Sequence, residues 1–127
     1  MFYRGHEHKR IFLETLKELY KPVYQMTPEF LSALFLLTSN NKLWHRVKNA
    51  VSMNVVEFEK INIRKINIDG YTLCKLAQDL YEGTSHVDFA NVSNPDIVSD
   101  KLFNLIKSAL QIKRNGCCAF KIHDGGL

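Results

Sequence analysis

The fold is decided by one stretch of the chain, TPEFLSALFLL at residues 27–37. Thr27 is a favourable N-cap residue, and Pro28 suits the first position of a helix, where no backbone N–H is needed. The residues that follow are apolar on every side of the helix that they would form. Because such a helix is stable only when neighbours enclose it, we predict a central helix here. Ser39 and Asn40 are expected to end it and to cap the next helix.

Four further helices are expected around this central one. Apolar residues recur at three- and four-residue steps over about residues 6–20, 41–52, 69–82 and 99–114. Pro22, Gly83 and Gly116 are natural stops, and Ser99 is a natural start. The predicted fold class is therefore all-α, a compact bundle of about five helices with a central apolar helix. A single helical domain is expected over 1–116, with a C-terminal tail at 117–127 from which Phe120 and Ile122 fold back.

One segment before the fourth helix does not follow a helical pattern. Residues 61–68 alternate isoleucine with polar residues, which favours a short strand or an extended segment. Just before this segment, Val55, Val56 and Phe58 could extend a helix. A strand here would need a partner, and the sequence identifies none.

A second irregular segment, residues 84–98, is rich in Ser, Asn and Pro and is predicted to be a loop. Val87, Phe89 and Val92 are expected to pin it to the core. A loop of this length in a compact domain is either functional or partly structured.

Composition places the chain among ordinary globular proteins. It has 127 residues, of which 46% are hydrophobic and 24% are charged. No stretch is long and apolar enough for a membrane span, and the first residues lack the apolar core of a secretion signal. The cysteines Cys74, Cys117 and Cys118 are odd in number and two are adjacent, which favours a reducing compartment. We therefore expect a cytoplasmic protein without a membrane partner, in which Cys74 is a small buried residue.

The sequence contains little that indicates catalysis. His6-Glu7-His8 is the one cluster that resembles a metal motif, but side chains two positions apart point about 200° away from each other on a helix. We instead expect His8 to contact Phe12. The sequence has no nucleophile elbow, phosphate-binding loop or dinucleotide fingerprint. We therefore predict no catalytic residues, no metal and no cofactor, although side chains that converge only in the fold would escape this reasoning.

Positive charge is concentrated in the first half of the chain. Residues 1–65 carry 11 basic and 6 acidic residues, whereas residues 66–127 carry 6 basic and 7 acidic ones. The helix at 41–52 has a basic face, and nearby basic residues could extend it. The candidate interaction surface comprises Lys42, His45, Arg46, Lys48, Lys60, Arg64 and Lys65. It could contact phosphates, but a solvated basic face is the simpler interpretation. Trp44, on the same helix, is expected in the core.

Four segments together resemble a known family. They are 5–12 (GHEHKRIF), 31–47 with its run ALFLL at 33–37, 76–83 (LAQDLYEG) and 100–114 with ALQIKR at 109–114. The pattern is similar to an uncharacterised family of small proteins from Gram-positive bacteria, their phages and integrative elements. The resemblance covers about residues 5–115 and consists of core patterns. It implies a cytosolic bacterial protein carried by a phage or mobile element, and it brings no functional residues with it.

Two functions follow as expectations. The first is a small non-enzymatic domain that binds a protein partner, for which an inhibitor of a host nuclease or defence complex is one concrete form. The mildly basic charge argues against a DNA mimic, which would be strongly acidic. The alternative is a nucleic-acid-binding regulator that uses the basic face of the helix at 41–52.

Overall fold

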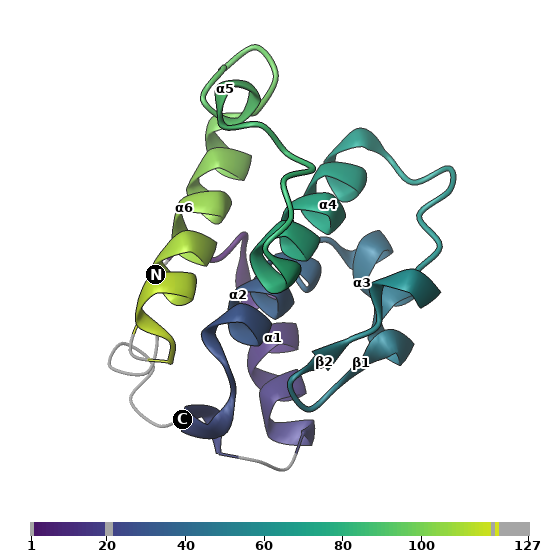
Figure 1. The fold of residues 1–127 in the computed structure, drawn as a ribbon, viewed down its shortest axis with the longest axis vertical. Helices are drawn as coiled ribbons and strands as arrows, with labels where there is room; N and C mark the ends of the chain where they lie inside the picture. The colour runs from purple at the N-terminus through teal and green to yellow at the C-terminus, as the bar shows by residue number, and fades with distance from the viewer. Residues whose placement is uncertain (1, 20–21, 118, 120–127) are drawn as a thin grey trace.

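The computed structural model describes residues 2–19, 22–117 and 119, apart from the side chains of Val23 and Phe89. In this part of the chain six α-helices and one small hairpin form a compact, mostly helical domain (Figure 1). The helices are α1 (His6–Glu18), α2 (Pro28–Leu37), α3 (Asn41–Val47), α4 (Ile68–Glu82), α5 (Phe89–Val92) and α6 (Asp100–Asn115). The predicted all-α class is confirmed, and α5 is a short helix that the sequence did not indicate.

The helix α2 lies at the centre, as predicted. Figure 1 shows it between α6 on one side and α4 and α3 on the other. All residues from Phe30 to Leu37 are buried, and α2 packs most extensively against α4 and α6. Buried hydroxyls on and just after the helix are paired within it: Ser32 donates to the Glu29 carbonyl at 3.1 Å, and Thr38 donates to the Leu34 carbonyl at 2.8 Å. The helix is thus enclosed without leaving a polar group unpaired.

The predicted helix ends are mostly confirmed. The Thr27 hydroxyl accepts from the Phe30 N–H at 3.1 Å with Pro28 in the first turn, and the Ser99 hydroxyl accepts from the Leu102 N–H at 3.2 Å. Gly83 ends α4 with φ of 76°, a left-handed conformation that favours glycine. α6 ends at Asn115, before Gly116.

The predicted helix at 41–52 is too long. α3 ends at Val47, a 3₁₀ turn follows (η2, Lys48–Ala50), and the chain enters a hairpin of β1 (Val51–Ser52) and β2 (Val55–Val56). The strands are antiparallel, with Val51 opposite Val56. The idea that Val55 and Val56 extend a helix is therefore wrong. The β-branched valines pair across the hairpin instead, which a continuous helix would prevent.

Asn54 explains why the chain turns at this place. Its φ of 59° is left-handed, which Asn tolerates better than most residues. Its side chain accepts from the Thr27 N–H at 2.9 Å and donates to the Gln25 carbonyl at 3.1 Å, while its own carbonyl accepts from the Tyr81 hydroxyl at 3.0 Å. The hairpin tip is thereby joined to the start of α2 and to α4.

Of the predicted strand or extended segment at 61–68, the strand is absent: residues 61–67 are irregular with a turn at 64 and 65, and Ile68 already belongs to α4. After a 3₁₀ turn (η3, Phe58–Lys60) the chain is irregular, turns at residues 64 and 65, and enters α4 at Ile68. Ile61, Ile63 and Ile66 are half-buried and pack against the core one by one. The β-branched pattern thus reflects these separate contacts rather than pairing in a sheet.

The segment 84–98 is partly structured, which is one of the two alternatives expected. It contains α5, a single turn of helix, and it is pinned by Val92 and Val98, which are buried, and by Val87, which is half-buried. The expectation for Phe89 concerns a side chain outside the described part. The same is true of Phe120, Ile122 and most of the tail, whereas Cys117 is described and packs against the core.

We predict that Leu34→Ala lowers the free energy of unfolding by about 2–5 kcal/mol, because the side chain is fully buried in the central helix and leaves a cavity. Urea denaturation followed by circular dichroism measures the change. The matched control, Leu110→Ala on the exposed side of α6, should cost less than about 1 kcal/mol. A similar small cost for Leu34→Ala would contradict the central position of α2.

Candidate functional site

The seven predicted basic residues are exposed but do not share one face. Arg46 turns toward the irregular segment after η3, where its guanidinium donates to the carbonyls of Asn62, at 3.2 Å, and Arg64. This pairing places Arg64 and Lys65 beside α3. Lys60 forms an ion pair with Glu57 at 2.7 Å. His45 is exposed on α3.

Lys42 and Lys48 point to two other places. Lys42 lines a hollow of about 390 Å³ together with Arg4 and Lys101. Lys48 lines a different hollow, of about 510 Å³, between α1 and the stretch from α3 to β1. Since residues two positions apart point to opposite sides of a helix, Arg46 and Lys48 diverge. The contiguous basic surface is thus smaller than the sequence predicted.

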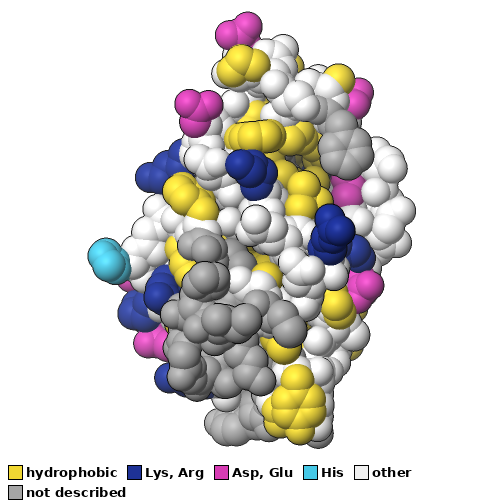
Figure 2. All heavy atoms as spheres, turned by 90° about the vertical axis from the view of Figure 1, so that its left-hand side faces the viewer, with side chains coloured by type: hydrophobic (Ala, Val, Ile, Leu, Met, Phe, Trp, Pro, Cys, Tyr) yellow, Lys and Arg dark blue, Asp and Glu magenta, His cyan; other side chains and the backbone are white. Residues whose placement is uncertain are grey.

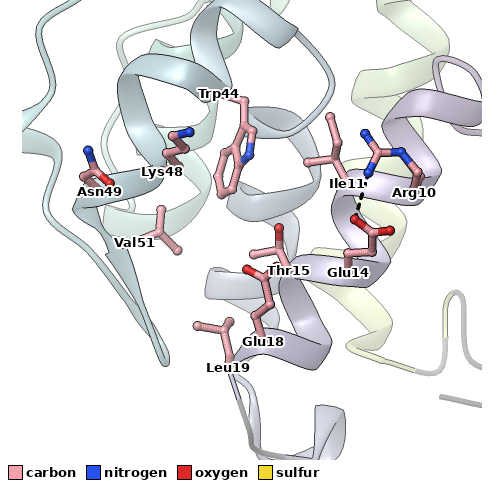
Figure 3. A pocket seen from close by; sticks show the side chains of 10 residues that line it. All are labelled: Arg10, Ile11, Glu14, Thr15, Glu18, Leu19, Trp44, Lys48, Asn49 and Val51. Atoms are coloured by element: carbon pink, nitrogen blue, oxygen red, sulfur yellow. Dashed lines mark hydrogen bonds and ion pairs between the residues drawn. The ribbon is translucent and has the colours of Figure 1, made fainter.

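Trp44 is half-buried: it packs against the core, as expected, and also lines the larger hollow. Figure 3 shows its ring projecting from α3 toward α1, where Thr15 and Glu18 face it. The charges around this hollow balance, because Arg10 forms an ion pair with Glu14 at 2.8 Å and Glu18 lies on the side opposite Lys48. A balanced rim gives little attraction for a phosphate.

His8, from the motif that resembles a metal site, has a structural role. It is 3% exposed, and its ring contacts those of Phe35 and Phe12, as expected for Phe12. Its Nδ1 accepts from the Arg4 N–H at 2.9 Å, so Nε2 carries the proton and donates to the Phe35 carbonyl at 2.8 Å. Both ring nitrogens are therefore occupied. Burial lowers the pKa of His8 to about 4, against the opposing effect of the Phe35 carbonyl.

The most distinctive surface lies on the other half of the molecule. We call it the α4–α6 groove. Its volume is about 320 Å³, and it lies between α4, α6 and the segment 84–93. Figure 2 shows the side of the molecule on which α6 lies. Hydrophobic side chains gather in a hollow in its upper half, with basic side chains at the edge of the hollow. The apolar lining residues are Leu76, Leu80, Val87, Val92, Phe103, Ile106 and Leu110.

A second apolar hollow, of about 280 Å³, lies on the other side of the same segment. It is lined by Ile68, Tyr71 and Ile97, of which Ile68 is 77% and Ile97 60% exposed. Val87 and Val92 line both hollows. The segment 84–98 therefore lies like a ridge between two apolar depressions.

Asp79 holds this ridge in place. Its carboxylate accepts from the Thr84 hydroxyl at 2.6 Å and from the His86 N–H, the His86 ring and the Val87 N–H, each at 2.8 Å. Burial raises the pKa of Asp79, but these donors outweigh burial, led by the His86 N–H, so the pKa falls below its ordinary value. The carboxylate thus stays charged at neutral pH and fixes one wall of the groove.

The Cys74 thiol is not activated as a nucleophile. Cys74 is buried, and burial raises the pKa of its thiol to about 11, so it stays protonated at neutral pH. Over residues 2–19, 22–117 and 119, no group of three or more His, Cys, Asp or Glu side chains could hold a metal ion. Nor does that part of the chain contain a helix with the length and apolar character needed to cross a bilayer.

Sequence reasoning missed the α4–α6 groove, although part of its signal was present. The buried stripe of α6 is formed by Leu102, Leu105, Ile106, Ala109 and Ile112. Phe103 and Leu110 are large apolar residues outside that stripe, and each is 38% exposed. Their position off the stripe is the signal. The role of Asp79 could not be found in this way, because its partners lie beyond the end of the helix.

Comparisons of the chain with protein-family models, with curated proteins and with solved structures find no match. The resemblance to the family from Gram-positive bacteria and their mobile elements therefore stays a prediction.

We predict that His8 makes stability depend on pH. The pKa is lower in the folded chain, about 4 against 6.5, so the unfolded chain binds more protons between these values. Folding stability from this group is complete above about pH 6.5 and is lost as the pH falls, by about 2 kcal/mol at pH 5. Urea denaturation at pH 7.5 and pH 5 measures the loss. His8→Gln should be less stable at pH 7.5 but should lose this pH dependence; an unchanged dependence would contradict the assignment.

Proposed function

We propose that the chain is a protein-binding domain that docks its partner in the α4–α6 groove. The observation that carries the proposal is the apolar lining of that groove, which is open to solvent. Of the eight large hydrophobic residues that are exposed in the described part, Phe103 and Leu110 line this groove, and Ile68, Tyr71 and Ile97 line the second hollow on the other side of the segment 84–98. Single exposed apolar residues are common, but a group around a hollow is typical of a binding surface.

The walls of the groove also favour docking. Leu80 and Ile106 belong to the hydrophobic core, and Asp79 fixes the segment 84–87. A partner therefore meets a surface that is already formed, which lowers the entropy cost of binding.

A more specific form of the proposal rests on the family resemblance. If the chain comes from a phage or mobile element, its partner in the cytoplasm would be a host protein, such as a nuclease or a defence complex that the domain inhibits. Inhibition through an apolar groove suits this chain better than mimicry of DNA. A DNA mimic would be strongly acidic, whereas this chain has a net charge of +4.

We predict that Phe103→Glu and Leu110→Glu each abolish binding of the partner without unfolding the domain, because both side chains are at the surface and a carboxylate there opposes apolar docking. Affinity capture from cells that carry the gene, with quantification of stoichiometric proteins, measures the effect.

The matched control is Tyr24→Glu. Tyr24 is 69% exposed, belongs to the 3₁₀ turn Val23–Gln25 between α1 and α2, and does not line the groove. Its capture profile should equal that of the original chain. Loss of the partner in all three variants, or in none of them, would reject the groove as the docking site.

A second candidate function is nucleic-acid binding, and one observation favours it. The bonds from Arg46 to the carbonyls of Asn62 and Arg64 bring Arg64 and Lys65 next to α3. A small basic surface thus forms from segments that are apart in the sequence, and such a surface can contact phosphates.

In this second case, Arg64→Glu combined with Lys65→Glu should abolish a gel shift with DNA or RNA, and binding by the original chain should weaken steeply as salt rises. Arg46 is left unchanged because it holds the segment in place. The control is Lys17→Glu on α1, which is exposed and lies on another element. Binding that survives the double substitution would exclude this surface.

A further inference from the structure

The walls of the α4–α6 groove have a helical register. α6 contributes Phe103, Ile106, Lys107 and Leu110, which are spaced three, four and seven residues from the first. At 1.5 Å per residue, these positions span about 10 Å, or roughly two helical turns. α4 contributes Leu76 and Leu80 from the opposite wall. The hollow thus runs along about two turns of α6, which is long enough to receive the apolar side of a short helix.

The described backbone around the groove offers no sheet edge to which a partner could add a strand. An extended peptide needs free N–H and C=O groups on a sheet edge, and the strands of the described chain are confined to residues 51–56. Two of the three groove walls are α4 and α6, whose backbone groups are paired within each helix, and the third wall, the segment 84–93, contains no strand. A docked helix brings its own paired backbone and needs only apolar contacts from the walls.

The charges at the rim are unequal. Asp79 and Lys107 are the charged residues that line the groove, and the Asp79 carboxylate is already occupied by donors from Thr84, His86 and Val87. The Lys107 ammonium lies over the Phe103 ring, 5.7 Å from its centroid, and forms no ion pair with a described residue. Arg114 continues the same stripe of α6, seven residues further, and is also exposed.

The opposite rim carries no such positive charge. Thr84, Ser85 and Ser93 line it and are neutral. Lys113 is the residue before Arg114, but its ammonium donates to the Leu80 carbonyl at 3.0 Å and forms an ion pair with Glu29 at 3.3 Å. Free positive charge at the groove therefore lies along α6.

The geometry points to an amphipathic helix of a partner protein, two to three turns long, that places apolar residues in the α4–α6 groove and acidic residues along α6. Its apolar anchors would recur at steps of three, four and seven residues. Its acidic edge would face Lys107 and Arg114, and its opposite edge would be polar and uncharged. This inference rests on the proposed docking function and adds the chemistry of the partner.

The test is a selection from a library of displayed random 16-residue peptides against the folded chain, with removal of peptides that also bind the Leu110→Glu variant. Enriched peptides should carry the apolar spacing above with Asp or Glu on one edge. One enriched peptide is then titrated by fluorescence anisotropy, beside a matched peptide in which each acid is replaced by Lys. Lys107→Glu should weaken the acidic peptide about fivefold and strengthen the Lys peptide.

Lys101→Glu is the control for charge. It is an equally exposed lysine of α6 that does not line the groove, and it should change neither affinity by much. Circular dichroism and urea denaturation verify that each variant is folded.

Enriched peptides that are apolar but basic, or that carry alternating rather than helical spacing, would overturn the inference while the docking function stands. Absence of any groove-dependent peptide would also overturn it. The capture experiment with Phe103→Glu and Leu110→Glu then decides separately whether the groove binds a folded partner by other means.

Discussion

The burial of α2 is the constraint on which the rest of the structure depends. From Phe30 to Leu37 the helix has no polar side to present to water, and its buried hydroxyls are paired with its own carbonyls. It is stable only when enclosed. Each surrounding helix therefore needs to offer only one apolar stripe, which leaves its outer side open to other uses. His8 is enclosed in a similar way. Its neutral ring lies in the core beside Phe35, and both ring nitrogens are hydrogen-bonded.

The two helices that pack most extensively on α2 are also the walls of the groove. Two of its three walls are therefore helices that are packed directly on the central helix. Its third wall is irregular in backbone, but Asp79 converts it into a fixed element by collecting donors from Thr84, His86 and Val87. A docking site formed in this way needs little rearrangement when a partner binds.

The sequence could predict the features that depend on interactions between residues close together in the chain, but not those that depend on residues far apart in it. Caps such as Thr27 and Ser99 act within one turn, so the helix starts were predictable. The hairpin was not, because its turn is fixed by the bonds of Asn54 to the start of α2 and to α4, far away in the sequence. The prediction of one continuous basic surface was wrong for the same reason. All seven residues are exposed, but Arg46 and Lys48 leave α3 in different directions, and Arg46 is drawn to a segment whose path only the fold reveals.

Phe103 and Leu110 decide how the exposed side of α6 should be interpreted. The helix already has a complete buried stripe, so folding does not require large apolar residues at these two positions. Polar residues there would keep the helix and would expose less apolar surface to water. Stability therefore does not account for them, whereas the groove that they share with Leu76 and Leu80 does. Ile106 belongs both to the buried stripe and to the groove, but Phe103 and Leu110 line the groove from outside that stripe, so substitutions at these two positions change the groove and leave the stripe in place.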